Sequence, residues 1–116
     1  MSGCKIPTHE IVFQSHEALK VGIEVDADLI YFQGHFNQKP VLAGVVQLHW
    51  VCHFARLMAN RLILTGASVL KFQKPVLPTM QLDLNIQFDK DKSVIIFSYQ
   101  HETITYSSGK LNVRLS

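Results

Sequence analysis

The stretch from Tyr31 to Trp50 reads YFQGHFNQKPVLAGVVQLHW. Its first half is a loop that carries His35 between Gly34 and Pro40, and its second half opens the longest apolar segment of the chain. Because Pro40 fixes its own φ and disfavours helical backbone at the residue before it, a helix must begin after Pro40. The stretch therefore predicts a titratable side chain beside the N-terminus of a helix.

The segment after Pro40 predicts one long helix that is mostly buried. It contains no proline from Val41 to Leu64, and no Asp or Glu. We expect the helix to run from Ala43 or Gly44 to about Leu64, where Thr65-Gly66 ends it, since glycine suits the left-handed position after a helix. At about 100° per residue, the polar residues of the segment fall on one stripe. They are His49, His53, Arg56 and Asn60.

Alternation of apolar and polar residues predicts strands on both sides of the helix. The expected strands are 18–25, 67–74, 80–88 and 93–100, with a charged turn at 89–92. The last segment, 103–115, is either one strand bent at Ser107-Ser108-Gly109 or two short strands joined by a turn there. The leader before residue 18 has no clear pattern. One long helix among antiparallel strands predicts an α+β fold in which the sheet wraps around the helix.

The composition indicates one globular domain over residues 1–116. A chain of this length buries about two thirds of its unfolded surface in a single core. Hydrophobic residues make up 47% of the chain and charged residues only 17%, which excludes a disordered chain and favours association through apolar surface. The net charge of +2, without a run of Lys or Arg, gives no support for nucleic-acid binding.

The sequence predicts neither a targeting segment nor a membrane span. The first ten residues contain Lys5, His9 and Glu10 but no apolar run, and the apolar segment 41–55 is too short to cross a bilayer. Two cysteines, Cys4 and Cys52, form no disulfide framework and fit a reducing compartment. We therefore expect a cytoplasmic protein with free thiols.

Several motifs resemble one known family. The residues Gly34-His35-Phe36, Pro40-Val41 and Gly44-Val45, with the helix behind them, resemble the signature of the hotdog-fold 3-hydroxyacyl-[acyl-carrier-protein] dehydratases of the FabZ/FabA type. The segment 72–78, FQKPVLP, is similar to the stretch that precedes a long strand in that family. The resemblance extends from about residue 19 to residue 113. Residues 45–50, VVQLHW, most resemble the ApeI-like dehydratases associated with aryl polyene biosynthesis.

The resemblance implies a hotdog fold and a reaction that needs no cofactor. The reaction would dehydrate a 3-hydroxyacyl thioester on acyl carrier protein to a trans-2-enoyl thioester, in fatty acid or aryl polyene-type biosynthesis. His35 would be the base, because an imidazole titrates near the operating pH. The N–H of Gly44 would hold the thioester oxygen, since the first turn of a helix has unpaired donors and a positive dipole end. The implied substrate-binding residues are Phe36, Pro40, Val45 and His53.

The sequence departs from the family pattern at three positions. Asn37 and Ala43 stand where the family often has proline, which changes the stiffness of the loop. The larger departure is His49, at the helix position where the family usually has Glu or Asp. As an imidazolium, His49 would protonate the leaving hydroxyl; as a neutral imidazole, it would orient water or substrate. We include His49 with His35 and Gly44 in the expected catalytic set, with these two roles left open.

Other functions compete with dehydration. A hotdog thioesterase generally uses a carboxylate to activate water, and the helix has none. A non-catalytic subunit that binds acyl chains or completes a partner's active site fits the loss of the carboxylate, whereas His35 argues against it. A metal site at His49, Cys52 and His53 lacks further ligands of recognisable spacing, and we expect no metal.

The expected partners follow from the same resemblance. The known fold brings the two catalytic side chains together from different protomers, so we expect a homodimer or a heterodimer with a related hotdog subunit. The second partner is the acyl carrier protein itself, which is acidic. The side chains available to meet it are Lys39, Lys71 and Lys74.

Overall fold

The computed structural model describes residues 6–26 and 41–116. These residues form one helix and a six-stranded antiparallel sheet. The elements are, in chain order, β1 (Thr8–Gln14), β2 (Ala18–Glu24), α1 (Gly44–Ala55), β3 (Leu62–Phe72), β4 (Gln81–Asp89), β5 (Val94–His101) and β6 (Ile104–Leu115). The strand order in the sheet is β1-β2-β4-β5-β6-β3, so β1 and β3 are its edges.

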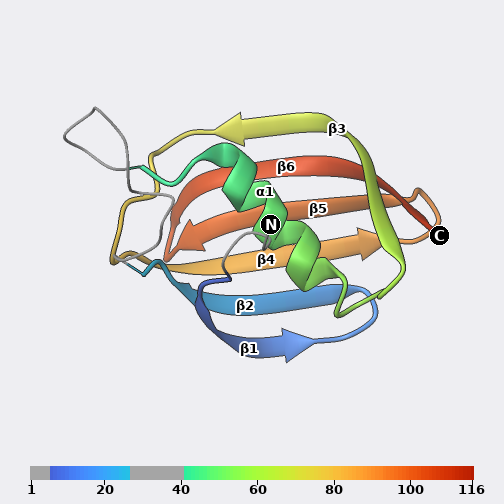
Figure 1. Ribbon diagram of the computed structural model, residues 1–116, viewed down its shortest axis with the longest axis horizontal. Helices are drawn as coiled ribbons and strands as arrows, with labels where there is room; N and C mark the ends of the chain where they lie inside the picture. Colours follow the sequence, from blue (N-terminus) through green and yellow to red (C-terminus); the bar gives the residue numbers. More distant parts are fainter. Residues whose placement is uncertain (1–5, 27–40) are drawn as a thin grey trace, which may run out of the picture.

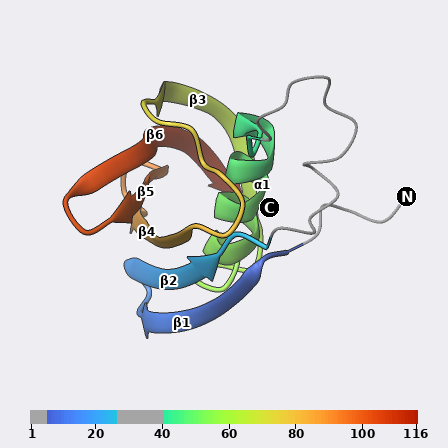
Figure 2. The same ribbon diagram turned by 90° about the vertical axis from the view of Figure 1, so that its left-hand side faces the viewer.

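The helix α1 lies across one face of the sheet (Figure 1). Figure 2 shows that the sheet curves around the helix. The strand alternation predicted from sequence places apolar side chains on this concave face, as with Leu19, Val21 and Ile23 of β2, which are all buried. Trp50 and Phe54 of α1 are fully buried against the sheet. The arrangement is the hotdog fold, and the predicted α+β class is confirmed.

The helix is much shorter than predicted. It ends at Ala55, and Arg56 is its C-cap, so the expected end near Leu64 is wrong. The backbone tightens after Ala55, where the N–H of Met58 donates to the Ala55 carbonyl at 2.9 Å. The chain then enters β3 at Leu62, which pairs with β6 and is 1% exposed. Pairing with β6 and burial of Leu62 therefore override the helical pattern of the sequence.

Two residues near the predicted helix end have other roles. Gly66 lies inside β3, at a register shift between Leu64 and Gly66, and does not end a helix. Asn60 lies beyond α1, so the polar stripe within the helix consists of His49 and His53, and Arg56 caps the helix. β3 accordingly begins earlier than the strand predicted for 67–74.

The strand β1 is an element that the sequence analysis missed. Every one of its residues is exposed. This edge strand therefore has no buried face, and it lacks the alternation of buried apolar and exposed polar residues that predicts a strand. β1 pairs with β2, with a register shift between Ile11 and Phe13. It matters for the site because it brings His9 to the ring of Phe54 in α1, with ring centroids 4.8 Å apart.

The C-terminal segment is a single strand. β6 pairs with β5 on one side and with β3 on the other, which settles the choice left open at Ser107-Ser108-Gly109. Gly109 fits there because a Cβ would lie 2.6 Å from Cε2 of Phe97 and 2.7 Å from the Val69 carbonyl oxygen. Gly109 therefore lets β6 continue as one strand while its neighbours β5 and β3 pack closely against it.

Candidate active site at the N-terminus of the helix

The structure describes four of the seven predicted site residues. Gly44, Val45, His49 and His53 all lie on α1, as predicted. His35, Phe36 and Pro40 lie outside the described residues.

The first turn of α1 has no side-chain cap. Ala43 is the N-cap, with extended backbone at φ −64° and ψ 147°, and the first turn contains no acidic residue. The Ala43 carbonyl accepts hydrogen bonds from the N–H groups of Val46 at 3.1 Å and Gln47 at 3.2 Å. The helix dipole makes this end positive. The turn therefore offers an environment suited to a negatively charged oxygen.

A groove of about 390 Å³ lies beside this first turn. The residues that line it come from two segments, the start of α1 and the chain that follows β3. The two segments are joined where the N–H of Leu42 donates to the Val76 carbonyl at 2.8 Å. The lining residues are Val41, Leu42, Ala43, Gly44, Gln47, Phe72, Gln73, Lys74, Pro75 and Val76.

Gly44 lies directly under the ring of Phe72. A Cβ at Gly44 would be only 2.8 Å from Cζ of Phe72, closer than two carbon atoms can pack. The sequence predicted a role for Gly44 through its backbone N–H. The structure adds a neighbour within the protein, because the aromatic ring at the end of β3 already packs there.

Gln47 is a polar residue of the groove that the sequence analysis missed. Its side chain is 3% exposed and makes hydrogen bonds with Leu42 and Ser107. The signal was available in the sequence, because Gln47 lies off the polar stripe, about 200° around the helix from His49. A single amide on an otherwise apolar face indicates a buried polar contact.

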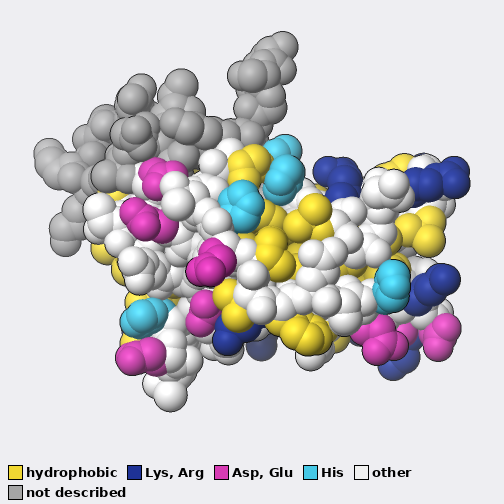
Figure 3. Space-filling view, turned by 90° about the horizontal axis from the view of Figure 1, so that it is seen from below, with side chains coloured by type: hydrophobic (Ala, Val, Ile, Leu, Met, Phe, Trp, Pro, Cys, Tyr) yellow, Lys and Arg dark blue, Asp and Glu magenta, His cyan; other side chains and the backbone are white. Residues whose placement is uncertain are grey.

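The histidines lie on the outward side of α1. His49 is half-buried and His53 is exposed, and the ring of His53 packs edge-on against Phe54, with centroids 5.0 Å apart. Partial burial lowers the pKa of His53, and the nearby charges of His9, His49 and Arg56 lower it further. Figure 3 looks at the β1 edge, where histidine side chains gather beside hydrophobic ones.

Neither the cysteine nor the histidines form a metal centre in the part of the chain that the structure describes. Within residues 6–26 and 41–116 no group of three or more His, Cys, Asp or Glu side chains is placed to hold a metal ion. Cys52 is a buried free thiol, and burial raises its pKa, with Arg56 opposing the change. Cys4 lies outside the described residues.

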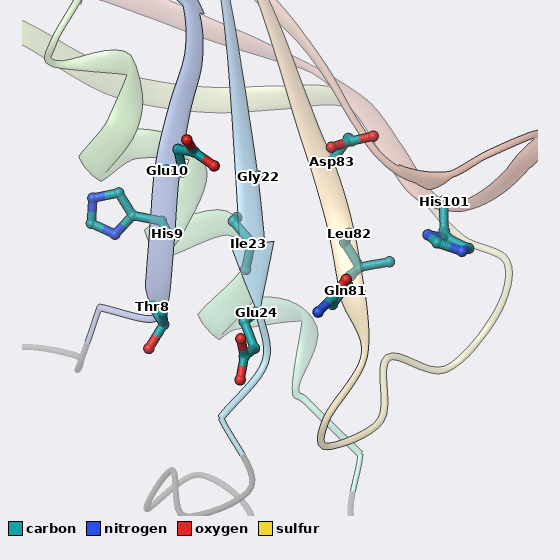
Figure 4. Close-up of a pocket in the computed structure, with 10 residues that line it drawn as sticks. All are labelled: Thr8, His9, Glu10, Gly22, Ile23, Glu24, Gln81, Leu82, Asp83 and His101. Carbon is teal, nitrogen blue, oxygen red and sulfur yellow. The ribbon is translucent and has the colours of Figure 1, made fainter.

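A second hollow, of about 400 Å³, lies on the opposite face of the sheet. Figure 4 shows Glu10, Glu24 and Asp83 there, projecting from β1, β2 and β4, with α1 behind the sheet. None of the four predicted site residues that the structure describes lines this hollow. In the same described ranges, no helix has the length and hydrophobicity that a membrane crossing requires.

The comparison with known families decides the assignment. A family model described as ApeI-like, ApeI dehydratase, matches residues 9–110 of the chain. The chain belongs to the ApeI-like dehydratase family. The match extends from β1 into β6 and includes the whole of α1.

Solved structures agree with this membership. The ApeI-like chain is similar to the dehydratase heterocomplex ApeI:P from Xenorhabdus doucetiae, with a TM-score of 0.88 and 31% identity, covering 94% of this chain and 98% of that one. An uncharacterised protein from Erwinia carotovora subsp. atroseptica aligns with a TM-score of 0.83 and 31% identity, over 96% of this chain and 98% of that one.

A curated relative of the ApeI-like chain is the 3-hydroxyacyl-[acyl-carrier-protein] dehydratase FabZ of Anaeromyxobacter dehalogenans strain 2CP-1. The two are 28% identical over 96 residues, which are 73% of this chain and 62% of the relative. The chain thus spans about three fifths of the length of that relative.

Proposed function

We propose that this ApeI-like chain dehydrates 3-hydroxyacyl thioesters on acyl carrier protein to trans-2-enoyl thioesters. The observation that carries the proposal is the match to the ApeI dehydratase model through residues 9–110. The FabZ relative, named for this reaction, supports the same substrate class. We also propose fatty acid or aryl polyene-type biosynthesis as the context, on the strength of the family name.

In the proposed mechanism, His35 takes the proton from C2 of the substrate. The C2–H electron pair moves toward the thioester carbonyl, and the N–H of Gly44 holds the oxygen on which charge develops. The electrons then form the C2=C3 double bond as the C3–O bond breaks. His49, as an imidazolium, gives the departing hydroxyl a proton so that it leaves as water. No electron acceptor or added reactant is needed.

The first turn of α1 supports the role given to Gly44. Its N-cap residue is an alanine with no polar side chain, so no Ser, Thr, Asp or Asn at that position competes with a substrate oxygen for the helix donors. The groove beside it holds about 390 Å³, enough for the thioester end of a substrate. Val45, which is 73% exposed, offers an apolar contact at the same end of the helix.

We propose that β3 forms the contact with a second hotdog subunit. It is an edge strand, and an unpaired edge carries free backbone donors and acceptors. β3 also ends at Phe72, which packs on Gly44, so a subunit joined there would lie beside the site. Its exposed apolar side chains are Leu64, Val69, Leu70 and Phe72.

We propose that the carrier protein approaches the same end of the molecule. Lys71 and Lys74 are exposed near the end of β3, and Lys74 lines the groove. Their positive charge would favour an acidic partner over short distances.

The test of the function is direct. Purified protein is incubated with 3-hydroxyacyl acyl carrier protein, and the carrier-bound product is followed by mass spectrometry. We expect loss of water with the wild-type chain and with His16→Ala, an exposed histidine in the turn between β1 and β2. We expect none above background with His35→Ala. A free carboxylic acid would identify a thioesterase, and equal turnover by His35→Ala would overturn the mechanism.

A second candidate function is a subunit that completes the active site of a related chain. It is favoured by His49 in place of the usual carboxylate and by the solved relative, which is a dehydratase heterocomplex. Under this alternative the chain alone would be inactive and would gain activity only when mixed with a related hotdog subunit. Retained activity of such a mixture after His35→Ala would then assign the chemistry to the partner.

A further inference from the structure

Gln47 is an unusual residue for the face of α1 on which it lies. That face is otherwise apolar, with Trp50, Val51 and Phe54 completely buried. Gln47 itself is 3% exposed. Among the described residues, Ser107 is the other buried polar residue. A buried amide destabilises a fold unless it is hydrogen-bonded. The hydrogen bonds of Gln47 therefore explain why it can be buried here.

Four hydrogen bonds converge on Gln47. Ser107 Oγ donates to its Oε1 at 2.7 Å, and Tyr99 Oη donates to its carbonyl oxygen at 2.6 Å. Its Nε2 donates to the Leu42 carbonyl at 3.2 Å, and its backbone N–H donates to the Ala43 carbonyl at 3.2 Å. Gln47 therefore ties β5 and β6 to the two peptide units that lead into the helix.

The chemistry of these partners fixes the orientation of the amide. The Leu42 carbonyl only accepts hydrogen bonds, so the NH₂ group must face it, while the Ser107 hydroxyl can donate to the oxygen. Burial raises the pKa of Tyr99 well above its ordinary value, which keeps its hydroxyl protonated as a donor. Each group in the network thus has a defined role.

The contacts of Gln47 lead to the peptide unit that carries the Gly44 N–H. That N–H belongs to the same peptide unit as the Ala43 carbonyl, and in a trans unit the two groups point in opposite directions. Because the described chain contains no cis peptide bond, holding the Ala43 carbonyl toward the helix turns the Gly44 N–H outward. Gln47 holds this peptide with its backbone and the preceding one with its side chain.

We infer that Gln47 is a positioning residue, which orients the Leu42–Ala43–Gly44 backbone so that the Gly44 N–H faces the reacting thioester. The effect of this orientation on the reaction rests on the proposed function. It assigns Gln47 no contact with substrate. Its side chain acts through Leu42, so the expected kinetic effect is on kcat rather than on KM.

The kinetic test compares Gln47→Leu with Tyr99→Phe. Gln47→Leu removes two buried hydrogen bonds, one to the Leu42 carbonyl and one from Ser107, and Tyr99→Phe removes one. Only Gln47→Leu frees the Leu42 carbonyl. We expect Gln47→Leu to lower kcat by roughly ten- to hundredfold with little change in KM, and Tyr99→Phe to change kcat by less than about threefold. Equal kcat losses in the two variants would reduce Gln47 to a general packing role and overturn the inference.

A conservative variant provides a second kinetic test. In Gln47→Glu the introduced group can donate to Leu42 only when protonated, and burial raises the pKa of a carboxyl group. We expect kcat of Gln47→Glu to be near wild type at low pH and to fall as the carboxyl ionises, relative to the wild-type pH profile. A pH-independent ratio of the two rates would contradict the role of the donor.

A readout without turnover separates this inference from the proposed function. The ¹⁵N–¹H signal of Gly44 reports the direction and hydrogen bonding of its amide. We expect Gln47→Leu to shift this signal strongly and Tyr99→Phe to leave it near its wild-type position, whether or not the chain dehydrates a substrate. If wild-type protein makes no enoyl product but Gly44 shifts as expected, the positioning role stands and the proposed function fails. An unchanged Gly44 signal in folded Gln47→Leu overturns the inference.

Discussion

The two faces of α1 differ in exposure and in what they contribute. The face toward the sheet carries Trp50 and Phe54, both fully buried, together with Gln47. The opposite face carries His49 and His53, and Val45 is 73% exposed there. The inward face stabilises the fold, whereas the outward face presents groups that titrate. Gln47 shows that the division is incomplete, since this polar side chain of the inward face is hydrogen-bonded to the Leu42 carbonyl at the start of the helix.

The largest effect on stability is expected from the inward face. Trp50→Ala removes a side chain with no exposed surface, and we expect it to lower the free energy of unfolding by about 3 to 5 kcal/mol. Val45→Ala on the outward face should change it by less than about 0.5 kcal/mol. Urea unfolding followed by circular dichroism measures both. Similar losses of unfolding free energy in the two variants would contradict the distinction between the faces.

Among the described residues, the largest effect on chemistry is expected from His49 on the outward face. His49→Ala should lower kcat by roughly a hundredfold if the imidazolium is the general acid, while leaving the unfolding free energy nearly unchanged. Arg56→Ala is the matched control, because Arg56 lies on the same stripe and is exposed. Steady-state kinetics with a carrier-bound substrate measures the effect. A loss below threefold would leave His49 only the role of orienting water or substrate.

A smaller effect is expected where Gly44 meets β3. Gly44→Ala should destabilise the protein by about 1 to 2 kcal/mol, because the new Cβ would lie 2.8 Å from Cζ of Phe72. Phe72 is 48% exposed, so its ring can turn aside and limit the cost. A double-mutant cycle with Phe72→Ala should remove most of the penalty. Equal penalties in both backgrounds would show that the ring is not its cause.

The smallest effect is expected from the pH response of His53. Because burial and the neighbouring charges lower its pKa in the folded protein, the unfolded chain binds its proton more readily. Its contribution to stability is therefore complete above the unfolded pKa of about 6.5 and is lost as pH falls through the folded value. NMR titration should give a His53 pKa below that of a free histidine, and His53→Gln should flatten this part of the stability profile. A raised pKa of His53 would contradict this prediction, because its contribution to stability would then be lost as pH rises.

The sequence predicted the parts of the fold that depend on the alternation of apolar and polar residues and on the position of proline. The alternating residues of β2 and β4 predicted strands close to the observed bounds, and Pro40 correctly predicted that the helix begins after it. The start of α1 at Gly44 was one of two starts considered. The motif resemblance identified the fold, which no periodicity alone distinguishes from other α+β arrangements.

The errors have a common physical cause, which is pairing between distant strands. The end of α1 is set by Leu62 joining β6, and β1 exists through its pairing with β2 although it has no buried face. The position of Gln47 off the polar stripe was a local signal, but its partner Ser107 lies sixty residues away in the chain. Local pattern carries no information about such partners.

The central claim is that the Gly44 N–H receives the oxygen of a carrier-bound acyl group. It is tested most directly by adding an unreactive 3-hydroxyacyl pantetheine amide to ¹⁵N-labelled protein and following the Gly44 amide signal. We predict a downfield shift of Gly44 that saturates with the analogue and is weakened in Gln47→Leu. An unchanged Gly44 signal, with shifts confined to the Glu10, Glu24 and Asp83 hollow on the other face of the sheet, would contradict the account.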